Sequence, residues 1–184
     1  MPFPNPALTI DDIYALPEGQ RAELINGKLY MMAPPNRIHQ KLSNRLSQKI
    51  TNYIDLMHKE CEVYTAPFAV FLNADDQTYV EPDISVICDP DKLNNQGCNG
   101  APDFIIEIVS PSSRKMDYSI KNALYSNAGV REYWIVDPSK ERTTVYRYQQ
   151  DAAPMIFMFD QEIPVGIYDG LRICIAKLIG TSNL

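Results

Sequence analysis

The sequence predicts an α/β (α+β) fold in which a central mixed β-sheet is flanked by helices. Two short runs rich in Ile and Val, residues 80–87 and 104–109, have the length and composition of strands buried on both faces. Residues 38–57 carry apolar side chains at the 3.6-residue spacing of a long amphipathic helix. The order along the chain, which is helix, hairpin, helix, strands, helix and strands, predicts helices on the faces of the sheet.

The first third of the chain contains clear boundary signals. Thr9 with Asp12 resembles a capping box, so a short helix should begin there and run to residue 16, before Pro17-Glu18-Gly19. Residues 22–25 and 28–32 flank Asn26-Gly27, the dipeptide best suited to a tight hairpin turn. The long helix follows Pro34-Pro35, and residues 61–72 then predict a strand.

The second half is predicted in the same way. Residues 89–102 form a polar loop, and residues 116–128 form a helix with Gly129 at its C′ position. Residues 133–136 and 144–148 predict two paired strands. The tail, residues 155–179, contains short β-rich runs such as 171–175, separated by Pro and Gly.

Size and composition favour one domain spanning residues 1–184, because 45% hydrophobic residues suffice for a core at this length. The four cysteines form no C-x-x-C pair, which predicts neither a disulfide framework nor a zinc site but four reduced thiols, as in a cytoplasmic protein. No apolar run is long enough to span a membrane, and the N-terminus lacks the order of a signal peptide.

The net charge of −6 counts against a broad nucleic-acid-binding surface, since such binding depends on Lys and Arg. A local basic patch would be needed. Arg37, Lys41, Arg45 and Lys49 recur every four residues and would form a stripe along the long helix. The alternative is an ordinary solvated helix face.

Two carboxylates lie inside the most apolar strands. Asp83 and Glu107 would be costly to bury as ions without compensation. A Mg²⁺ or Mn²⁺ ion would compensate both, because it prefers oxygen ligands and takes one or two carboxylates from protein. The main-chain carbonyl of Ile108 would supply a third oxygen. Such an ion lowers the pKa of a bound water, which then attacks phosphorus at neutral pH.

Lys121 is the candidate partner of the two acids. Asp117, Lys121 and Tyr125 follow at intervals of four residues and should share one helix face directed at the acidic pair. The alternative is an ordinary surface ion pair between Asp117 and Lys121. Ser110, Ser112 and Ser113 lack a nucleophile-elbow motif and are expected to shape the turn before this helix.

Several motifs in this order resemble a family of short, stand-alone proteins described as putative restriction endonucleases (Uma-type), within the PD-(D/E)XK nuclease superfamily. The resemblance covers roughly residues 9–148. It is carried by residues 23–27, His39, Glu81-Pro82-Asp83, residues 105–112, Asp117-x-x-x-Lys121-x-x-x-Tyr125 and residues 129–138. It implies a restriction-endonuclease-like fold with the metal site where two strands diverge.

By position, the resemblance makes Asp83 the aspartate of the motif and Glu107 its second acid. The superfamily's lysine should stand two residues after the glutamate, where this chain has Val109, so the resemblance implies that Lys121 takes that role. Glu23 resembles an additional acid that many members of the superfamily carry on a preceding element; the alternative is a surface charge on the hairpin. His39 would contact a phosphate or a metal-bound water, or would pack at the start of the helix.

These observations predict an endonuclease that hydrolyses DNA with Mg²⁺ (or Mn²⁺) and acts as a homodimer, with tail aromatics in the interface. Asp83, Glu107, Lys121 and Glu23 are the expected catalytic residues. The residues expected to bind nucleic acid are Arg37, His39, Lys41, Arg114 and Lys115. The alternative is a non-catalytic nuclease-like scaffold that binds nucleic acid or protein, which the acidic charge and Val109 favour. A nuclease acting on RNA or branched DNA is a third possibility.

Overall fold

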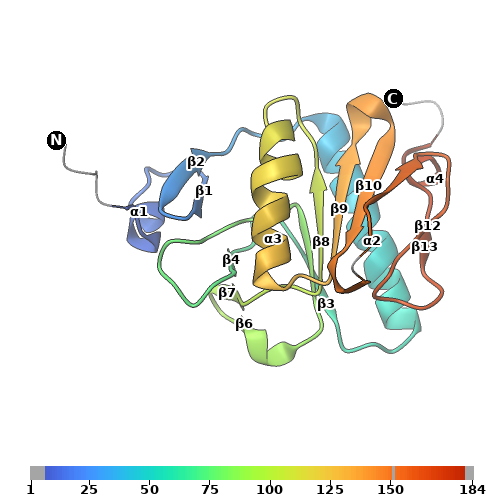
Figure 1. The fold of residues 1–184 in the computed structure, drawn as a ribbon, viewed down its shortest axis with the longest axis horizontal. Helices are drawn as coiled ribbons and strands as arrows, with labels where there is room; N and C mark the ends of the chain where they lie inside the picture. The colour runs from blue at the N-terminus through green and yellow to red at the C-terminus, as the bar shows by residue number, and fades with distance from the viewer. Residues whose placement is uncertain (1–6, 151, 181–184) are drawn as a thin grey trace.

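The fold is built on a six-stranded mixed sheet, seen in a computed structural model that describes residues 7–150 and 152–180 (Figure 1). The strand order is β11-β10-β9-β8-β5-β3. Strands β8 and β9 are parallel, and all the other neighbours are antiparallel. The strands are β3 (Glu62–Thr65), β5 (Ile84–Ile87), β8 (Phe104–Ile108), β9 (Glu132–Asp137), β10 (Arg142–Arg147) and β11 (Met155–Met158). The predicted mixed sheet is therefore confirmed.

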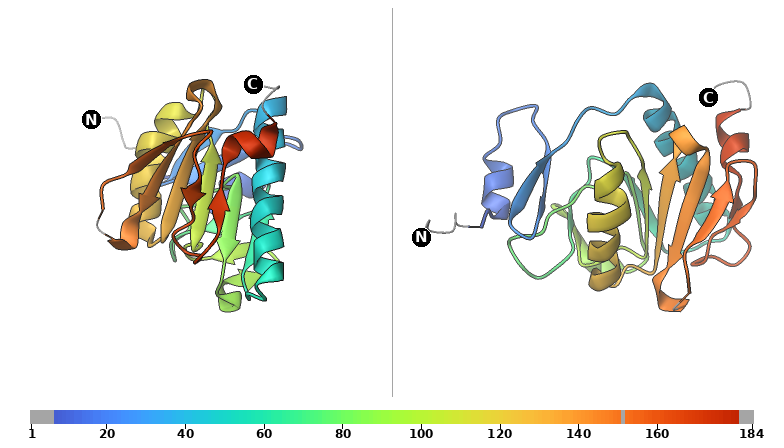
Figure 2. Two further views of the ribbon diagram at one scale, coloured as in Figure 1. Left: turned by 90° about the vertical axis from the view of Figure 1, so that its right-hand side faces the viewer. Right: turned by 45° about the horizontal axis from the view of Figure 1, so that its top comes forward.

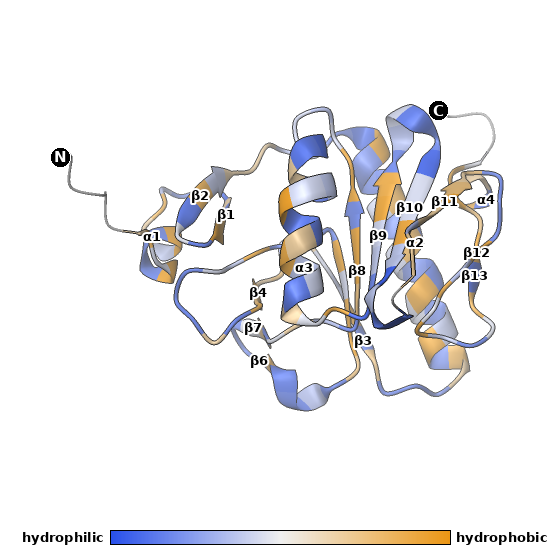
Figure 3. Ribbon diagram, viewed as in Figure 1, coloured by the Kyte–Doolittle hydropathy of each residue, from blue (hydrophilic) through white to orange (hydrophobic). Residues whose placement is uncertain are grey.

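Helices cover both faces of this sheet. Helix α2 (Arg37–Leu56) lies on one face, and the π-helical turn η2 (Met116–Lys121) with α3 (Asn122–Ala128) lies on the other (Figures 1 and 2). Because side chains alternate along a strand, Ile106 of β8 packs in the core beneath α2, whereas Ile105 packs in the core beneath α3. Both faces of β8 and β9 are therefore buried, and these strands are mostly hydrophobic in Figure 3.

The long helix is confirmed, and its buried row explains its position. Leu42, Leu46 and Ile50 are fully buried against the sheet, and each contributes roughly 1.5–3 kcal/mol through burial. Asn36 caps the helix by accepting a hydrogen bond from the His39 N–H at 2.9 Å. The cap fixes the first turn, which carries His39.

The N-terminal elements are also confirmed. Helix α1 (Ile10–Tyr14) begins at the capping box, in which the Asp12 carboxylate accepts from the Thr9 N–H at 2.8 Å. Strands β1 (Ala22–Ile25) and β2 (Lys28–Met31) form the hairpin, with positive φ angles at Asn26 and Gly27. Reciprocal backbone hydrogen bonds of 2.8 Å between Leu24 and Tyr79 hold β1 beside the chain that leads to Asp83.

Two predicted segments differ from the structure. The strand predicted over residues 61–72 stops at Thr65, since Pro67 has no N–H to donate to a ladder. The chain resumes as β4 (Val70–Phe71) in a second, three-stranded sheet. Its other strands, β6 (Leu93–Asn94) and β7 (Gly97–Asn99), lie with the 3₁₀ turn η1 (Pro90–Lys92) in the predicted loop 89–102. The Asn94 side chain accepts from the Gly97 N–H at 3.2 Å and so closes the turn between β6 and β7.

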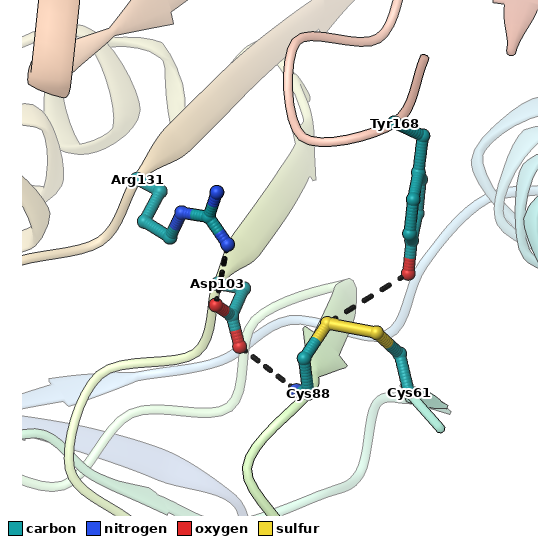
Figure 4. The surroundings of a disulfide bond; sticks show 5 residues. All are labelled: Cys61, Cys88, Asp103, Arg131 and Tyr168. Atoms are coloured by element: carbon teal, nitrogen blue, oxygen red, sulfur yellow. Dashed lines mark hydrogen bonds and ion pairs between the residues drawn. A yellow bond between two sulfur atoms is a disulfide. The ribbon is translucent and has the colours of Figure 1, made fainter. Parts of the chain in front are cut away.

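Cys61 and Cys88 form a disulfide, so the prediction of four reduced thiols is wrong for this pair (Figure 4). In the register of β3 and β5, Glu62 lies opposite Ile87, which places the two cysteines opposite each other one residue further out. The contact depends on strand pairing, which cysteine spacing does not reveal. The thiol argument for a cytoplasmic location therefore loses its basis, while Cys98 and Cys174 remain free and buried.

The C-terminal region forms short elements that complete the core beside α2. They are β12 (Ile163–Pro164), β13 (Arg172–Ile173) and α4 (Ile175–Ile179), and the 3₁₀ turns η3 (Pro138–Lys140) and η4 (Tyr148–Gln150) precede them. None of the helices in the described ranges is long and apolar enough to cross a membrane. Residues 1–6, which bear on the signal-peptide prediction, lie outside those ranges.

Candidate active site

Asp83 and Glu107 lie side by side where β5 and β8 stop pairing. The last antiparallel pair is Ile84 with Ile106, and the next position outward brings the two acids opposite each other. The Ile108 N–H donates to Asp83 Oδ2 at 2.7 Å, and the Asp83 N–H lies 3.4 Å from Glu107 Oε2. Side-chain oxygens thus replace main-chain partners at this point. The two carboxylates, separated by 23 intervening residues, form one acidic site.

Lys121 reaches this site from the helical segment that follows β8. Its ammonium lies 2.8 Å from Glu107 Oε1 and 2.9 Å from Glu23 Oε1, and all three side chains are almost fully buried. Glu23 is oriented by the Glu81 N–H, which donates to the same Oε1 at 3.0 Å. The hairpin, the central strand β8 and the helix after it therefore converge on one cation. This arrangement excludes the surface alternatives for Glu23 and Lys121.

The segment bearing Lys121 is not the regular helix that the sequence predicts. Met116–Lys121 is a π-helix, and the α-helix begins only at Asn122. Such wide turns are rare and are frequent at functional sites. Lys121 is its last residue, so the change in helix geometry occurs at the residue that contacts the two acids.

Tyr125 makes a second hydrogen bond to Glu107. Its hydroxyl donates to Glu107 Oε1 at 2.7 Å, so that oxygen accepts from both Tyr125 and Lys121. The other oxygen, Oε2, is turned toward Asp83. The spacing of Tyr125 predicts its place on the helix face of Lys121 but no function for its hydroxyl. The signal available was its four-residue spacing from Lys121.

Asp117 is buried near the site and is bound by a neighbour other than Lys121. Ser113 Oγ donates to Asp117 Oδ2 at 2.7 Å, but it does not cap the helical segment, whose N-cap residue is Lys115 and which has no side-chain cap hydrogen bond. Among the described residues, no ion pair joins Asp117 to Lys121. Burial raises the pKa of Asp117 to about 6, although Lys121 and the hydrogen bond from Ser113 act in the opposite direction.

His39 contacts the site from the first turn of α2. Its Nε2 lies 3.0 Å from Asp83 Oδ2, while its buried Nδ1 has no hydrogen-bond partner in the described part of the chain. The imidazole therefore contacts the same Asp83 oxygen that accepts from the Ile108 N–H. Of the two interpretations of His39, a position at the edge of the site fits this geometry.

The other residues predicted to bind nucleic acid are dispersed. Arg114 forms an ion pair with the fully buried Asp137 and donates to Ser139 at 2.7 Å, so its guanidinium is engaged within the fold. Arg114, and its hydrogen bonds, hold the pKa of Asp137 below its ordinary value despite the opposing effect of burial. Arg37 and Lys115 are exposed, and Lys41 is half-buried against α4.

Burial and neighbouring charges shift the pKa values of Glu107 and Lys121. Burial raises the pKa of Glu107; Lys121 opposes this rise, and Asp83, Asp117 and Glu23 add to it. Burial alone would lower the pKa of Lys121, but the surrounding carboxylates raise it well above its ordinary value. Lys121 therefore remains an ammonium, and it is surrounded by the carboxyl groups of Glu107, Glu23 and Asp117.

Asp83 and Glu107 are the side chains at this site that could hold a divalent cation. No group of three or more His, Cys, Asp or Glu side chains within the described ranges is arranged to hold a metal by itself. A cation here would take the two carboxylates of Asp83 and Glu107, with the Ile108 carbonyl and water as further ligands. Mg²⁺ commonly binds through one or two carboxylates and retains several waters.

One family model matches most of this chain, and two known proteins resemble it in sequence or in fold. The Uma2 family model, described as "Putative restriction endonuclease", matches residues 10–166. A protein of Synechocystis sp., described as uncharacterized protein slr1290, is 27% identical over 159 residues, which is 85% of this chain and 82% of that protein. A crystal structure from Anabaena variabilis, described as a putative nuclease belonging to DUF820, is similar in fold, with a TM-score of 0.76 and 22% identity. The match covers 94% of this chain and 97% of that one.

Proposed function

This chain belongs to the Uma2 family, described as putative restriction endonucleases, and from that membership we propose that it is a Mg²⁺- or Mn²⁺-dependent DNA endonuclease of the PD-(D/E)XK type. The observation that carries the proposal is the convergence of Asp83, Glu107 and Lys121 at the point where two central strands separate. A buried cluster of acids around one lysine is costly to maintain in a purely structural site.

Each residue has a distinct task in this proposal. Asp83 and Glu107 hold the metal ion, which, when bound, lowers the pKa of a water molecule and polarises the scissile phosphate. Lys121, held by Glu107 and Glu23, orients the attacking water and balances negative charge that develops on the phosphate. His39 fixes Asp83, and Tyr125 fixes Glu107.

The position of Lys121 also accounts for Val109. In the superfamily pattern the lysine stands two residues after the glutamate, on the same strand. Here Val109 is buried in the core beneath α3, and an ammonium reaches Glu107 from the neighbouring helix instead. In this proposal the positive charge of the superfamily's lysine is thus supplied by Lys121, from the helical segment after β8 instead of from the strand itself.

Cleavage of DNA tests this proposal. Supercoiled plasmid is incubated with the protein in Mg²⁺, in Mn²⁺ and in EDTA, and nicked and linear products are measured. We expect metal-dependent cleavage that falls at least 100-fold in Asp83→Asn and Glu107→Gln, in line with the loss of a metal that activates water. Glu60→Gln, an exposed acid outside the site, is the matched control. Cleavage at the wild-type rate in both site variants would refute the assignment.

Metal binding separates the enzyme from a non-catalytic scaffold. Titration calorimetry with Mn²⁺ should show stoichiometric binding that Asp83→Asn abolishes. A scaffold whose acids no longer function would show no such binding. Parallel assays on duplex DNA, RNA and branched DNA identify the substrate, and equal or faster cleavage of RNA would contradict the choice of DNA.

A further inference from the structure

A basic hollow lies between α2 and α4, away from the acidic site. Its volume is about 470 Å³. Figure 2 shows α4 beside the N-terminal half of α2. We call this hollow the α2–α4 groove. Its polar lining residues are Lys41, Arg45, Gln48, Lys49, Asn52 and Lys177.

The charge of this groove is opposite to that of the whole protein. Four of its lining side chains are cationic and none in the described part of the chain is acidic, although the chain carries a net charge of −6. Positive charges that lie close together repel one another. A basic cluster on an acidic protein therefore needs an explanation.

Two of the four cations are engaged in the fold and two are available. Lys41 donates to the Ile179 carbonyl at 2.6 Å, which ties α2 to α4, and Lys177 pairs with Glu162. Arg45 is exposed and contacts only the Gln48 side chain, at 3.2 Å. Lys49 is exposed, and the described residues offer it no ion-pair partner.

The spacing of these cations suits a repeating anion. Lys41, Arg45 and Lys49 are four residues apart, so they recur about every 6 Å along the helix axis. This interval is close to the separation of successive phosphates in an extended nucleic-acid strand. The amides of Gln48 and Asn52 add hydrogen-bond donors between them. Grooves with positive charge that follow the backbone are the usual means of binding nucleic acid without regard to sequence.

The groove shares its helix with the acidic site. His39, which contacts Asp83, lies on the same turn of α2 as Lys41, where the groove begins. We propose that the α2–α4 groove binds the sugar–phosphate backbone of the nucleic acid whose cleavage site lies at Asp83 and Glu107, with Arg45 and Lys49 making the phosphate contacts. This inference rests on the proposed nuclease function.

The test is the salt dependence of DNA binding by the full chain in EDTA, where cleavage is absent. Fluorescence anisotropy of a labelled 30-base-pair duplex is measured between 50 and 300 mM NaCl for wild type and for Arg45→Gln/Lys49→Gln. Losing two phosphate contacts should reduce the slope of log K against log salt by about 1.8, and affinity at 0.1 M salt by up to about 60-fold. Lys28→Gln/Lys59→Gln is the matched control, since both lysines are exposed outside the groove.

Equal slopes and affinities in the groove variant and the control would overturn the proposal. Sodium tripolyphosphate distinguishes a backbone site from a site for free phosphates. It should displace the duplex far less effectively than unlabelled DNA at equal phosphate concentration, and equal displacement would contradict the inference. Glu107→Gln should bind DNA like wild type while losing cleavage. The groove proposal is therefore tested by DNA binding, and the catalytic assignment is tested by DNA cleavage.

Discussion

Replacing Lys121 with methionine tests how the buried site is held together, independently of any catalytic activity. Methionine retains most of the apolar length of lysine and removes only the ammonium. Glu107 and Glu23, both about 5% exposed at the side chain, then lose their shared counter-charge. Breaking a buried ion pair by removing one partner typically costs 3–5 kcal/mol. We expect a loss in this range at pH 7.5 in EDTA, which prevents a divalent ion from replacing the lost charge.

The loss should depend on pH in a defined direction. In the wild type the pKa of Lys121 is raised, so its stabilisation is complete below pH 10.5 and declines only as pH rises through the folded-state value. In the variant, burial raises the pKa of Glu107 further because Lys121 no longer opposes it. The folded variant then binds more protons than its unfolded chain, so its stability decreases as pH rises above about 4.5. The difference from wild type should therefore be smaller at pH 5 than at pH 7.5.

The assay is urea unfolding at pH 7.5 and at pH 5, followed by circular dichroism, with the free energy taken by linear extrapolation. Lys115→Met is the control, because Lys115 is exposed near the start of the same helical segment. A deficit below 1 kcal/mol at pH 7.5, or one that is equal at the two pH values, would refute the interpretation of Lys121 as the counter-charge of two ionised acids.

Three further predictions follow from individual contacts. Tyr125→Phe removes the donor to Glu107 Oε1 and should cost about 1–3 kcal/mol in urea unfolding; unchanged stability would contradict that bond. Cys61→Ser opens the bridge to Cys88, and loop-closure entropy for a separation of 27 residues predicts a loss of about 3.5 kcal/mol without reductant. A loss that persists unchanged in dithiothreitol would exclude the disulfide as its cause. Asp117→Asn should stabilise the protein by up to about 3 kcal/mol at pH 7.5 and flatten its stability between pH 4 and 6, where folded Asp117 retains a proton that the unfolded chain has lost. An unaltered pH profile would disprove this effect.

Local signals in the sequence were sufficient for several elements. Asn26-Gly27 predicts the hairpin because few residue types adopt a positive φ angle, and this tight turn needs two of them in succession. The apolar spacing from Ile38 predicts α2, since its buried face is long and regular. Glu107 was identified because a charged residue among buried Ile and Val is exceptional.

Features that depend on contacts between distant segments were not predictable. The Cys61–Cys88 bridge arises from the register of β3 against β5, which no spacing of cysteines encodes. The ion pair between Arg114 and Asp137 likewise requires the end of β9 to lie beside the helical segment after β8, so the sequence alone placed Arg114 among the residues that bind nucleic acid. The π-helical turn ending at Lys121 has no sequence signature distinct from that of an α-helix.

Anomalous diffraction from a crystal soaked in Mn²⁺ shows whether Asp83 and Glu107 hold a metal ion. We expect one strong peak within coordination distance of Asp83 and Glu107, with the Lys121 ammonium still beside Glu107. A well-diffracting soaked crystal with no peak there, or with the peak at other side chains, would contradict the assignment of these acids as the metal site.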